Sequence, residues 1–297
     1  MIKIQSLTKS FNEVKVLEDI HMEIEKGSIY GLLGSNGAGK TTLFKLLTGI
    51  YKPDKGEIYI EGKSFEKSKD LKDIYFVQED IYISHNQTLL ERFYEERLYY
   101  PNSSEKIFTK LVDYFGLKTN QKLTTYSKGQ NKQGAFVLAM ASQASVLLLD
   151  EILDGIDAVV RKKFWKILLS EVIDRKLTVV ISSHALSELD NICDKFGILH
   201  EAHLIKEERM DQIKDEVKRV QFATKGFIVP ESTDEYSIVK HGKVGLVSDV
   251  IIKGDIEAFK ADLEAQHEIL MFEVLNLNLE EIFISELGGV NYGNENY

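Results

Sequence analysis

Cysteine is nearly absent from this chain of 297 residues. Cys193 is the only cysteine, which excludes an internal disulfide and leads us to expect a reducing compartment. Free cysteines most often pack as small apolar side chains, so we interpret Cys193 as structural rather than reactive.

Long apolar runs and basic blocks are also missing. No run of about 18 apolar residues occurs, so the sequence predicts no transmembrane helix, and the start MIKIQSLTKSF lacks the apolar core of a secretory signal. The chain has 37 Lys and Arg against 47 Asp and Glu, a formal net charge of −10. This balance argues against a nucleic-acid partner. We therefore expect a cytoplasmic protein whose role at a membrane, if any, depends on another subunit.

The first part of the chain has the patterning of an α/β unit. Apolar residues alternate in MIKI and again in IHMEI, as in half-buried strands. The run IYGLLG, 29–34, is apolar throughout, which is typical of a strand buried on both faces of a parallel sheet. A glycine loop, the helix-like KTTLFKLLTG and the strand-like GEIYIEG follow. Strand, glycine loop and helix in this order indicate a nucleotide-binding unit.

The pattern turns helical at about residues 85–145, where Pro101 separates LLERFYEERLYY from KIFTKLVDYFGL. Buried strands return in SVLLLDE and LTVVISS, with an amphipathic helix predicted from Ile156 to Arg175 between them. We predict a helical insertion into an α/β core.

The end of the chain differs in charge. After Val217 the sequence has 7 basic against 14 acidic residues, with glycines and a proline interrupting the pattern. We predict a cassette over 1–217 and a small α+β accessory domain over 218–297, with helices at DIEAFKADLEA and LEEIFISEL.

The segment GSNGAGKTT fits the phosphate-loop pattern G-x-x-x-x-G-K-[ST] and lies between the predicted strand and helix. Glycines let backbone N–H groups curl around phosphate, Lys40 neutralises charge between the β and γ phosphates, and the Thr41 hydroxyl ligates magnesium. The alternative is a plain glycine turn. The predicted ATP-contacting residues of the loop are Gly34, Ser35, Asn36, Gly37, Ala38, Gly39, Lys40, Thr41 and Thr42.

Acidic residues end the buried run VLLLDE. Asp150 is placed to hold the water shell of a magnesium ion, and Glu151 to polarise the attacking water. A strand end can also carry acids only for solvation. His184, at the end of VVISSH, is a candidate for contact with the γ-phosphate, although a lone strand-end histidine is usually a surface residue. The segment NKQG lacks the acid of a guanine-reading motif, which favours adenine or a permissive base site.

The segment TYSKGQ predicts a second helix start able to bind phosphate. Ser127 stands at the N-cap position and Gln130 three residues later, the spacing of a capping box.

These segments together resemble the ATP-binding cassette of ABC transporters. GSNGAGKTT, Gln78 in YFVQED, the signature YSKGQ, VLLLDE, ILDGID and the histidine of SSHALSE stand in the family's order and at its usual spacings over about residues 1–215. The resemblance implies an α/β phosphate-loop NTPase core with an antiparallel β subdomain and a helical insertion subdomain. It implies ATP and Mg²⁺ as ligands.

The resemblance also implies a partner cassette. Two cassettes of the family face each other head to tail, so Ser127, Gly129 and Gln130 would touch the nucleotide held by the partner. The pair could be a homodimer or a heterodimer.

Other roles follow from the resemblance alone. Phe11 would stack on adenine, unless it is an ordinary core phenylalanine. Gln78 would contact magnesium and water, and Asp157 would close the loop that crosses the dimer interface. The aromatic stretch from Tyr82 to Tyr100 would dock a helix of the membrane subunit, or would be subdomain core instead.

The sequence departs from the family pattern at two positions. Lys128 replaces the usual glycine of the signature, and Ile152 replaces the usual proline after Glu151. The segment HEAH, 200–203, is expected to be a hairpin tip rather than a metal site.

The resemblance implies an ATP-hydrolysing subunit of a bacterial exporter of drugs, antibiotics or peptides, possible cargoes including the amphipathic peptides of phenol-soluble modulin exporters. It would work on the inner face of the cell membrane beneath a separately encoded permease. The alternative is a soluble cassette ATPase acting on ribosomes or DNA. A regulatory pseudo-ATPase would have lost Lys40, Glu151 or His184, and all three are present.

Overall fold

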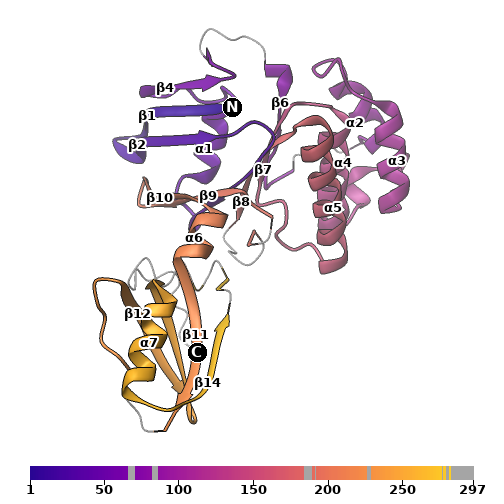
Figure 1. Cartoon of the computed structure of the whole chain (residues 1–297). Coiled ribbons are helices and arrows are strands. Elements are labelled where there is room, and N and C mark those ends of the chain that lie inside the picture. The colour runs from indigo at the N-terminus through magenta and orange to yellow at the C-terminus, as the bar shows by residue number, and fades with distance from the viewer. Residues whose placement is uncertain are drawn as a thin grey trace. The chain divides into compact units, whose positions relative to one another are not determined.

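The computed structural model shown in Figure 1 describes residues 1–65, 71–81, 86–183, 189–190, 192–225, 229–275, 277–278 and 281. The chain divides into two compact units. The first comprises Met1–Ala185 and Asn191–Glu207, and the second Leu186–Asp190 and Glu208–Tyr297.

A six-stranded sheet forms the centre of the first unit, with the order β10-β9-β3-β8-β7-β6. Its strands are β3 (Ile29–Leu33), β6 (Ile74–Val77), β7 (Val146–Asp150), β8 (Thr178–Ser183), β9 (Lys195–His200) and β10 (His203–Arg209). The ladders of β3 with β8 and β9, of β6 with β7 and of β7 with β8 are parallel. Every residue of β3, β7 and β8 is buried, which explains their unbroken apolar runs. Because parallel strands end at the same edge of a sheet, the last residues of β3, β7 and β8 lie close together.

A four-stranded antiparallel sheet, ordered β2-β1-β4-β5, packs on one side of this core. Its strands are β1 (Ile2–Phe11), β2 (Val14–Ile24), β4 (Lys55–Ile60) and β5 (Lys63–Ser64). Helix α1 (Lys40–Leu47) shares one apolar cluster with both sheets, through Leu43, Phe44 and Leu46. The glycine loop before α1 is therefore fixed by packing on two sides.

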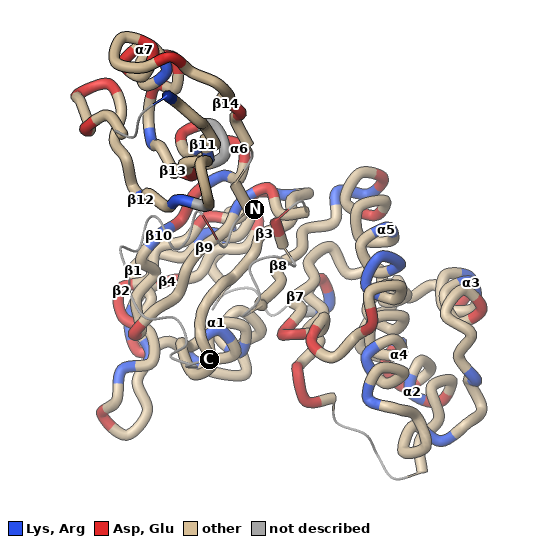
Figure 2. The backbone as a smooth tube through the Cα atoms, turned by 90° about the horizontal axis from the view of Figure 1, so that it is seen from below, with Lys and Arg blue, Asp and Glu red and all other residues tan. Residues whose placement is uncertain are grey.

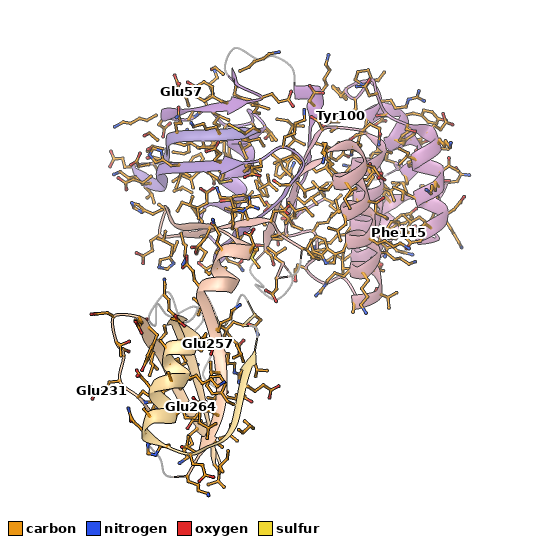
Figure 3. All side chains as sticks on the ribbon, viewed as in Figure 1. Glu57, Tyr100, Phe115, Glu231, Glu257 and Glu264 are labelled. Atoms are coloured by element: carbon orange, nitrogen blue, oxygen red, sulfur yellow. The ribbon has the colours of Figure 1, made fainter. Side chains whose placement is uncertain are left out.

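The other side of the core carries the helices seen to the right in Figure 1. They are α2 (Leu89–Glu96), α3 (Glu105–Phe115), α4 (Lys128–Ala141) and α5 (Ala158–Arg175), with single 3-10 turns at Leu71–Asp73 and Leu123–Thr125. Phe115, labelled in Figure 3, meets Phe136 of α4 and Phe164 of α5 edge to face. Stacked phenylalanine pairs join α4 to α5 and α2 to α3, with ring centroids 4.0 and 4.2 Å apart. Aromatic packing thus holds the helices in place around α4.

The second unit has its own sheet and core. Helix α6 (Met210–Glu216) leads into β11 (Val217–Thr224), β12 (Tyr236–Val244), β13 (Val247–Gly254), α7 (Ile256–Gln266) and β14 (Ile269–Leu275). The strands form an antiparallel sheet in the order β12-β13-β11-β14. Phe259 and Leu263 of α7 are fully buried against the apolar face of this sheet.

The predicted fold class is confirmed: an α/β core, an antiparallel β sheet, a helical insertion and a small α+β unit near the end. The strand β6 was not predicted, because it is only four residues long, Ile74–Val77, too short for a clear pattern. Helix α5 begins after Asp157, which caps it, rather than at Ile156. The predicted helix LEEIFISEL lies outside the described residues except for Glu281. None of the helices in the described ranges is long and apolar enough to span a membrane. In Figure 2, basic and acidic residues are interspersed along both units.

Candidate functional site

The glycine loop between β3 and α1 has a backbone that only glycine fits at two points. Gly39 has a φ of 108°, and a Cβ there would lie 2.7 Å from the backbone oxygen of Val16. A Cβ on Gly34 would lie 2.6 Å from the backbone oxygen of Leu199. Side chains at these positions would push the loop off its neighbours. The loop is thus held as a tight cradle at the start of α1.

The lysine of the loop points back into this cradle. Lys40 is only 5% exposed, and its Nζ donates hydrogen bonds to the backbone oxygens of Gly34 (2.6 Å) and Ser35 (3.2 Å). The same ammonium lies 3.1 Å from Glu151 Oε1. A buried cation therefore stands directly beside the carboxylate predicted to polarise water.

Thr41 and Asp150 meet, as their predicted shared role requires. Thr41 Oγ1 donates to Asp150 Oδ2 at 2.6 Å, and Ser182 Oγ of β8 donates to Asp150 Oδ1 at 2.6 Å. Ser182 Oγ also accepts from the Glu151 backbone N–H at 3.0 Å. Asp150 is 1% exposed, so these bonds fix its carboxylate. A threonine hydroxyl beside a carboxylate provides the hard oxygen donors that Mg²⁺ prefers, so the residues present fit that ion.

A cavity of about 200 Å³ opens above the loop. It combines the cation of Lys40 with two carboxylates, and its lining residues are Val16, Ser35, Asn36, Gly37, Gly39, Lys40, Thr41, Thr42, Glu79 and Glu151. The sequence reasoning did not single out Glu79, although it directly follows Gln78. Burial, and then the nearby charges of Glu151, Asp80 and Asp150, raise the pKa of the Glu79 carboxyl.

Gln78 lies elsewhere. It is exposed just after β6 and lines a different cavity of about 260 Å³ with Thr48, Ile50, Ile74, Phe76 and Tyr100. Tyr100, labelled in Figure 3, is held in the lining of this cavity by a hydrogen bond that its hydroxyl donates to the backbone oxygen of Ile74 at 3.1 Å. The structure does not bring Gln78 into the phosphate cavity, so its contact with magnesium and water stays a prediction.

Phe11 ends β1 at the surface. It is 38% exposed, meets the ring of Tyr51 edge to face with centroids 5.1 Å apart, and has Lys9 Nζ 5.3 Å from its own centroid. The alternative of a core phenylalanine is therefore wrong. Stacking of Phe11 on adenine stays a prediction.

The signature segment forms the predicted capping box at the start of α4. Ser127 Oγ accepts from the Gln130 N–H at 3.1 Å, and Gln130 Oε1 accepts from the Ser127 N–H at 2.9 Å. Ser127, Lys128 and Gln130 are exposed. None of the signature residues lines the phosphate cavity of its own chain.

The turn after β7 connects Glu151 to α5. Asp157 Oδ1 accepts from the N–H groups of Val159 and Val160, at 2.9 and 3.0 Å, and so caps α5. Ile152, where the family pattern has proline, is 1% exposed and packs into the interior. Glu151 itself has a φ of 44°, a left-handed backbone that a glutamate seldom adopts.

Sequence reasoning missed a buried lysine beneath this turn. Lys132 of α4 is 1% exposed, and its Nζ donates to the backbone oxygens of Glu151 (2.8 Å) and Asp154 (2.7 Å). Burial lowers the pKa of Lys132, while the charges of Asp154, Glu79 and Glu151 act in the opposite direction. Its sequence neighbours Asn131 and Gln133 are polar, so no local sequence signal distinguishes it from a solvent-facing helix lysine.

The remaining candidates fall into three groups. The segment HEAH forms the tip of the β9–β10 hairpin, with Glu201 and Ala202 at φ 44° and 69° in a two-residue turn. Within the described ranges, no group of three His, Cys, Asp or Glu is placed to hold a metal ion. Cys193 is buried, and burial raises the pKa of its thiol. His184 lies outside the described residues.

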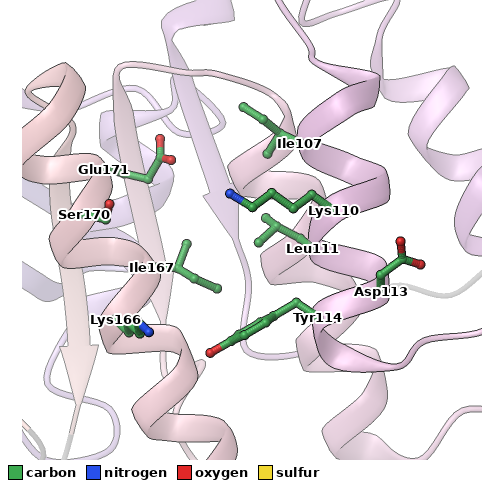
Figure 4. Close-up of a pocket in the computed structure, with 9 residues that line it drawn as sticks. All are labelled: Ile107, Lys110, Leu111, Asp113, Tyr114, Lys166, Ile167, Ser170 and Glu171. Atoms are coloured by element: carbon green, nitrogen blue, oxygen red, sulfur yellow. The ribbon is translucent and has the colours of Figure 1, made fainter.

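A larger cavity, of about 570 Å³, lies between α3 and α5 (Figure 4). Its walls mix apolar side chains with lysines and acids: Ile107, Lys110, Leu111, Asp113, Tyr114, Lys166, Ile167, Ser170 and Glu171. It contains none of the predicted site residues.

Known proteins resemble this chain over nearly all of its length. The family described as "ABC transporter" matches residues 17–154. The ABC transporter ATP-binding protein YtrB of Bacillus subtilis (strain 168) is 32% identical over 295 residues, covering 97% of this chain and 99% of that protein. The bacitracin transport ATP-binding protein BcrA of Bacillus licheniformis is 28% identical over 305 residues, covering 99% of each.

A solved structure has a similar fold. The ATP-binding cassette MJ0796, in a dimeric post-hydrolysis state bound to ADP and Pi, has a TM-score of 0.64 at 22% identity, covering 71% of this chain and 99% of that one. Similarity at this level of identity supports the cassette fold.

Proposed function

The chain belongs to the ABC transporter family as an ATP-binding, ATP-hydrolysing subunit, and from that premise we propose which of its residues carry out hydrolysis and how. The observation that carries the proposal is the convergence of Lys40, Thr41, Asp150 and Glu151 at the carboxyl ends of β3 and β7. The transporter assignment is favoured over a soluble cassette acting on ribosomes or DNA, since the relatives matched over nearly their full length are transport proteins.

The loop binds the phosphates of ATP. Its N–H groups and Lys40 provide positive charge at one wall of the cavity, and the uncapped start of α1 adds the partial charge of a helix N-terminus. When bound at Thr41 and Asp150, Mg²⁺ would neutralise charge on the β and γ phosphates. Glu151 orients and polarises the attacking water, because its carboxylate lines the cavity beside Lys40. We assign His184 to contact with the γ-phosphate, and Gln78 to contact with magnesium and water, when nucleotide and a partner are present.

The signature residues act on a partner. Ser127, Gly129 and Gln130 stand outside the cavity of their own chain. Ser127 and Gln130 are exposed and Gly129 is half-buried, which leaves the segment available to a second cassette. We place the two cassettes head to tail, as a homodimer or a heterodimer, with the signature of each over the nucleotide of the other. Phe11 stacks on adenine, and Asp157 lies at the interface.

The transport role requires a separately encoded permease. Tyr94, Leu98 and Tyr99 are exposed at the end of α2 and beyond it, so they offer apolar area for a helix of the membrane subunit. The protein would then sit on the inner face of the membrane. Bacitracin transport by BcrA favours export of a peptide antibiotic or another amphipathic compound. We assign the cassette to residues 1–217 and an accessory role to 218–297, a boundary that lies after the end of the first compact unit at Glu207 and so includes α6.

The test uses Glu151→Gln. Turnover should fall by about 10²- to 10⁴-fold, the range for a positioned general base, while ATP still binds. Light scattering with magnesium ATP should then show a dimer that is absent without nucleotide. Full turnover by the variant would remove Glu151 from the role of base. Binding of ATP without a dimer would contradict a homodimeric pair and point to a different cassette as partner.

A further inference from the structure

Lys132 is a charged side chain in a place where charge is costly. It projects from the second turn of α4, is 1% exposed, and belongs to the largest fully buried side chains of the described residues. A buried ammonium is tolerated only when hydrogen bonds replace its water shell. Two of these bonds go to backbone oxygens of one turn, those of Glu151 and Asp154.

That turn carries the proposed general base. The Asp154 N–H donates to the Glu151 backbone oxygen at 3.2 Å, so the two carbonyls held by Lys132 stand at the first and last residues of a closed turn. Glu151 adopts φ 44°, a conformation that persists only where the surroundings hold it. The direction of the Glu151 side chain, and hence its 3.1 Å approach to Lys40, depends on this backbone.

We propose that Lys132 is a positioning residue for hydrolysis, which holds the turn from Glu151 to Asp154 and thereby aims the Glu151 carboxylate at the phosphate cavity. The proposal rests on the proposed role of Glu151 as base. Helix α4 would then have two roles. Its N-terminus would contact the nucleotide of the partner, while Lys132, one turn further along, holds the turn that carries Glu151 of its own chain.

A purely structural lysine would make the same two hydrogen bonds. The difference lies in what its removal changes. A structural role predicts lower thermal stability with normal kinetics in the molecules that remain folded. A positioning role predicts a loss in kcat with little change in KM, because the loop that binds ATP keeps Lys40, Thr41 and its glycine backbone.

The experiment compares Lys132→Met with Lys132→Arg in steady-state ATP hydrolysis by the full chain. Methionine keeps the length and apolar stem but donates no hydrogen bond, so kcat should fall by about 10- to 100-fold with KM changed less than about twofold. Arginine keeps the charge and the donors and should restore most of the rate. Lys163→Met is the matched control, since Lys163 Nζ also donates to a backbone oxygen, that of Tyr114 at 3.1 Å, away from the cavity. It should leave kcat unchanged.

A double variant separates the possible outcomes. If Lys132 acts through Glu151, adding Lys132→Met to Glu151→Gln should cause no further loss of turnover. An additional loss of the same size as in the wild-type background would overturn the proposal. If Lys132→Met does not fold, Lys132→Gln supplies two amide donors on a shorter side chain and should fold with a reduced kcat. A wild-type kcat in any folded variant without the lysine also overturns it. Failure of the proposed function would be seen separately, as full activity of Glu151→Gln alone.

Discussion

The helices α1 and α4 both begin with residues proposed to hold phosphate, yet their first turns are built in opposite ways. α1 follows Gly39, has no side-chain cap, and starts with a lysine that is 5% exposed. α4 follows Ser127, whose side chain and that of Gln130 satisfy each other's backbone N–H groups at the surface.

The difference shows two ways of building an anion site. A helix start without a cap leaves backbone donors unpaired, which is unfavourable alone but favourable once a phosphate accepts them. The α1 loop can keep this arrangement because packing between two sheets fixes its backbone. The start of α4 has its own side-chain cap and needs no ligand, which agrees with the proposal that it meets only the nucleotide of a partner.

A third helix start shows that a capping box alone does not indicate a nucleotide site. α2 begins at Thr88 with the same box, in which Thr88 Oγ1 accepts from the Glu91 N–H at 3.2 Å and Glu91 Oε2 accepts from the Thr88 N–H at 2.8 Å. The α2 box differs from that of α4 in carrying a carboxylate, which would repel phosphate. It therefore provides an internal control.

The largest effect is expected at α1. Lys40→Ala should lower the affinity for ATP by about 10²-fold or more, because a buried charge-assisted contact is lost and Glu151 is left without its close cation. Equilibrium binding of a fluorescent ATP analogue measures this. Lys26→Ala removes the same charge from an exposed pair with Glu61 and should leave binding unchanged. Equal weakening by both variants would mean that general charge, rather than the loop, binds the nucleotide.

At α4 a smaller effect is expected, on turnover rather than on ATP binding. Ser127→Ala should lower turnover by about 10- to 100-fold, since it removes the hydroxyl proposed to lie over the partner's nucleotide, while ATP binding by the isolated chain stays intact. Steady-state hydrolysis and equilibrium binding measured together separate the two quantities.

The control is Thr88→Ala. Both alanine variants lose an N-cap, worth about 1 kcal/mol of stability, so their melting temperatures should fall by similar amounts. Turnover should fall for Ser127→Ala alone. A parallel loss of turnover in both would show that the α4 cap acts through stability, and the contrast between the two helix starts would disappear.

Local spacing was enough to predict much of this comparison. The motif GSNGAGKTT between an apolar strand and a helix predicted the loop, and Ser127 with Gln130 predicted the cap of α4, because both depend on residues close together in the sequence. The runs IYGLLG, VLLLD and TVVISS predicted three strands for the same reason: each is buried on both faces and reads as apolar throughout.

The parts that could not be predicted depend on contacts distant in sequence. Lys132 reads as a solvent-facing helix lysine until β7 and its following turn are placed over it. Which of Gln78 and Glu79 faces the cavity depends on the direction of the chain after the short strand β6. The exposure of Phe11 depends on where β1 ends relative to Tyr51.

The smallest expected effect is a pH dependence of stability, which should differ between the capping boxes of α2 and α4. Hydrogen bonds from the Thr88 backbone and then from its hydroxyl hold the pKa of Glu91 below its ordinary value of 4.5. The box of α2 therefore contributes its full stability above about pH 4.5 and loses it as the pH falls through the lowered pKa of Glu91. Gln130 does not titrate, so the stability contributed by the α4 box is not lost in this way as the pH falls.

An NMR titration of the Glu91 side-chain carboxyl measures the shift directly, and Thr88→Ala should return the pKa toward 4.5. An unshifted Glu91 in the wild-type chain would mean that the α2 box is not formed in solution. Thr88→Ala would then no longer be a matched control for Ser127→Ala, and the role of the α4 start would rest on its kinetics alone.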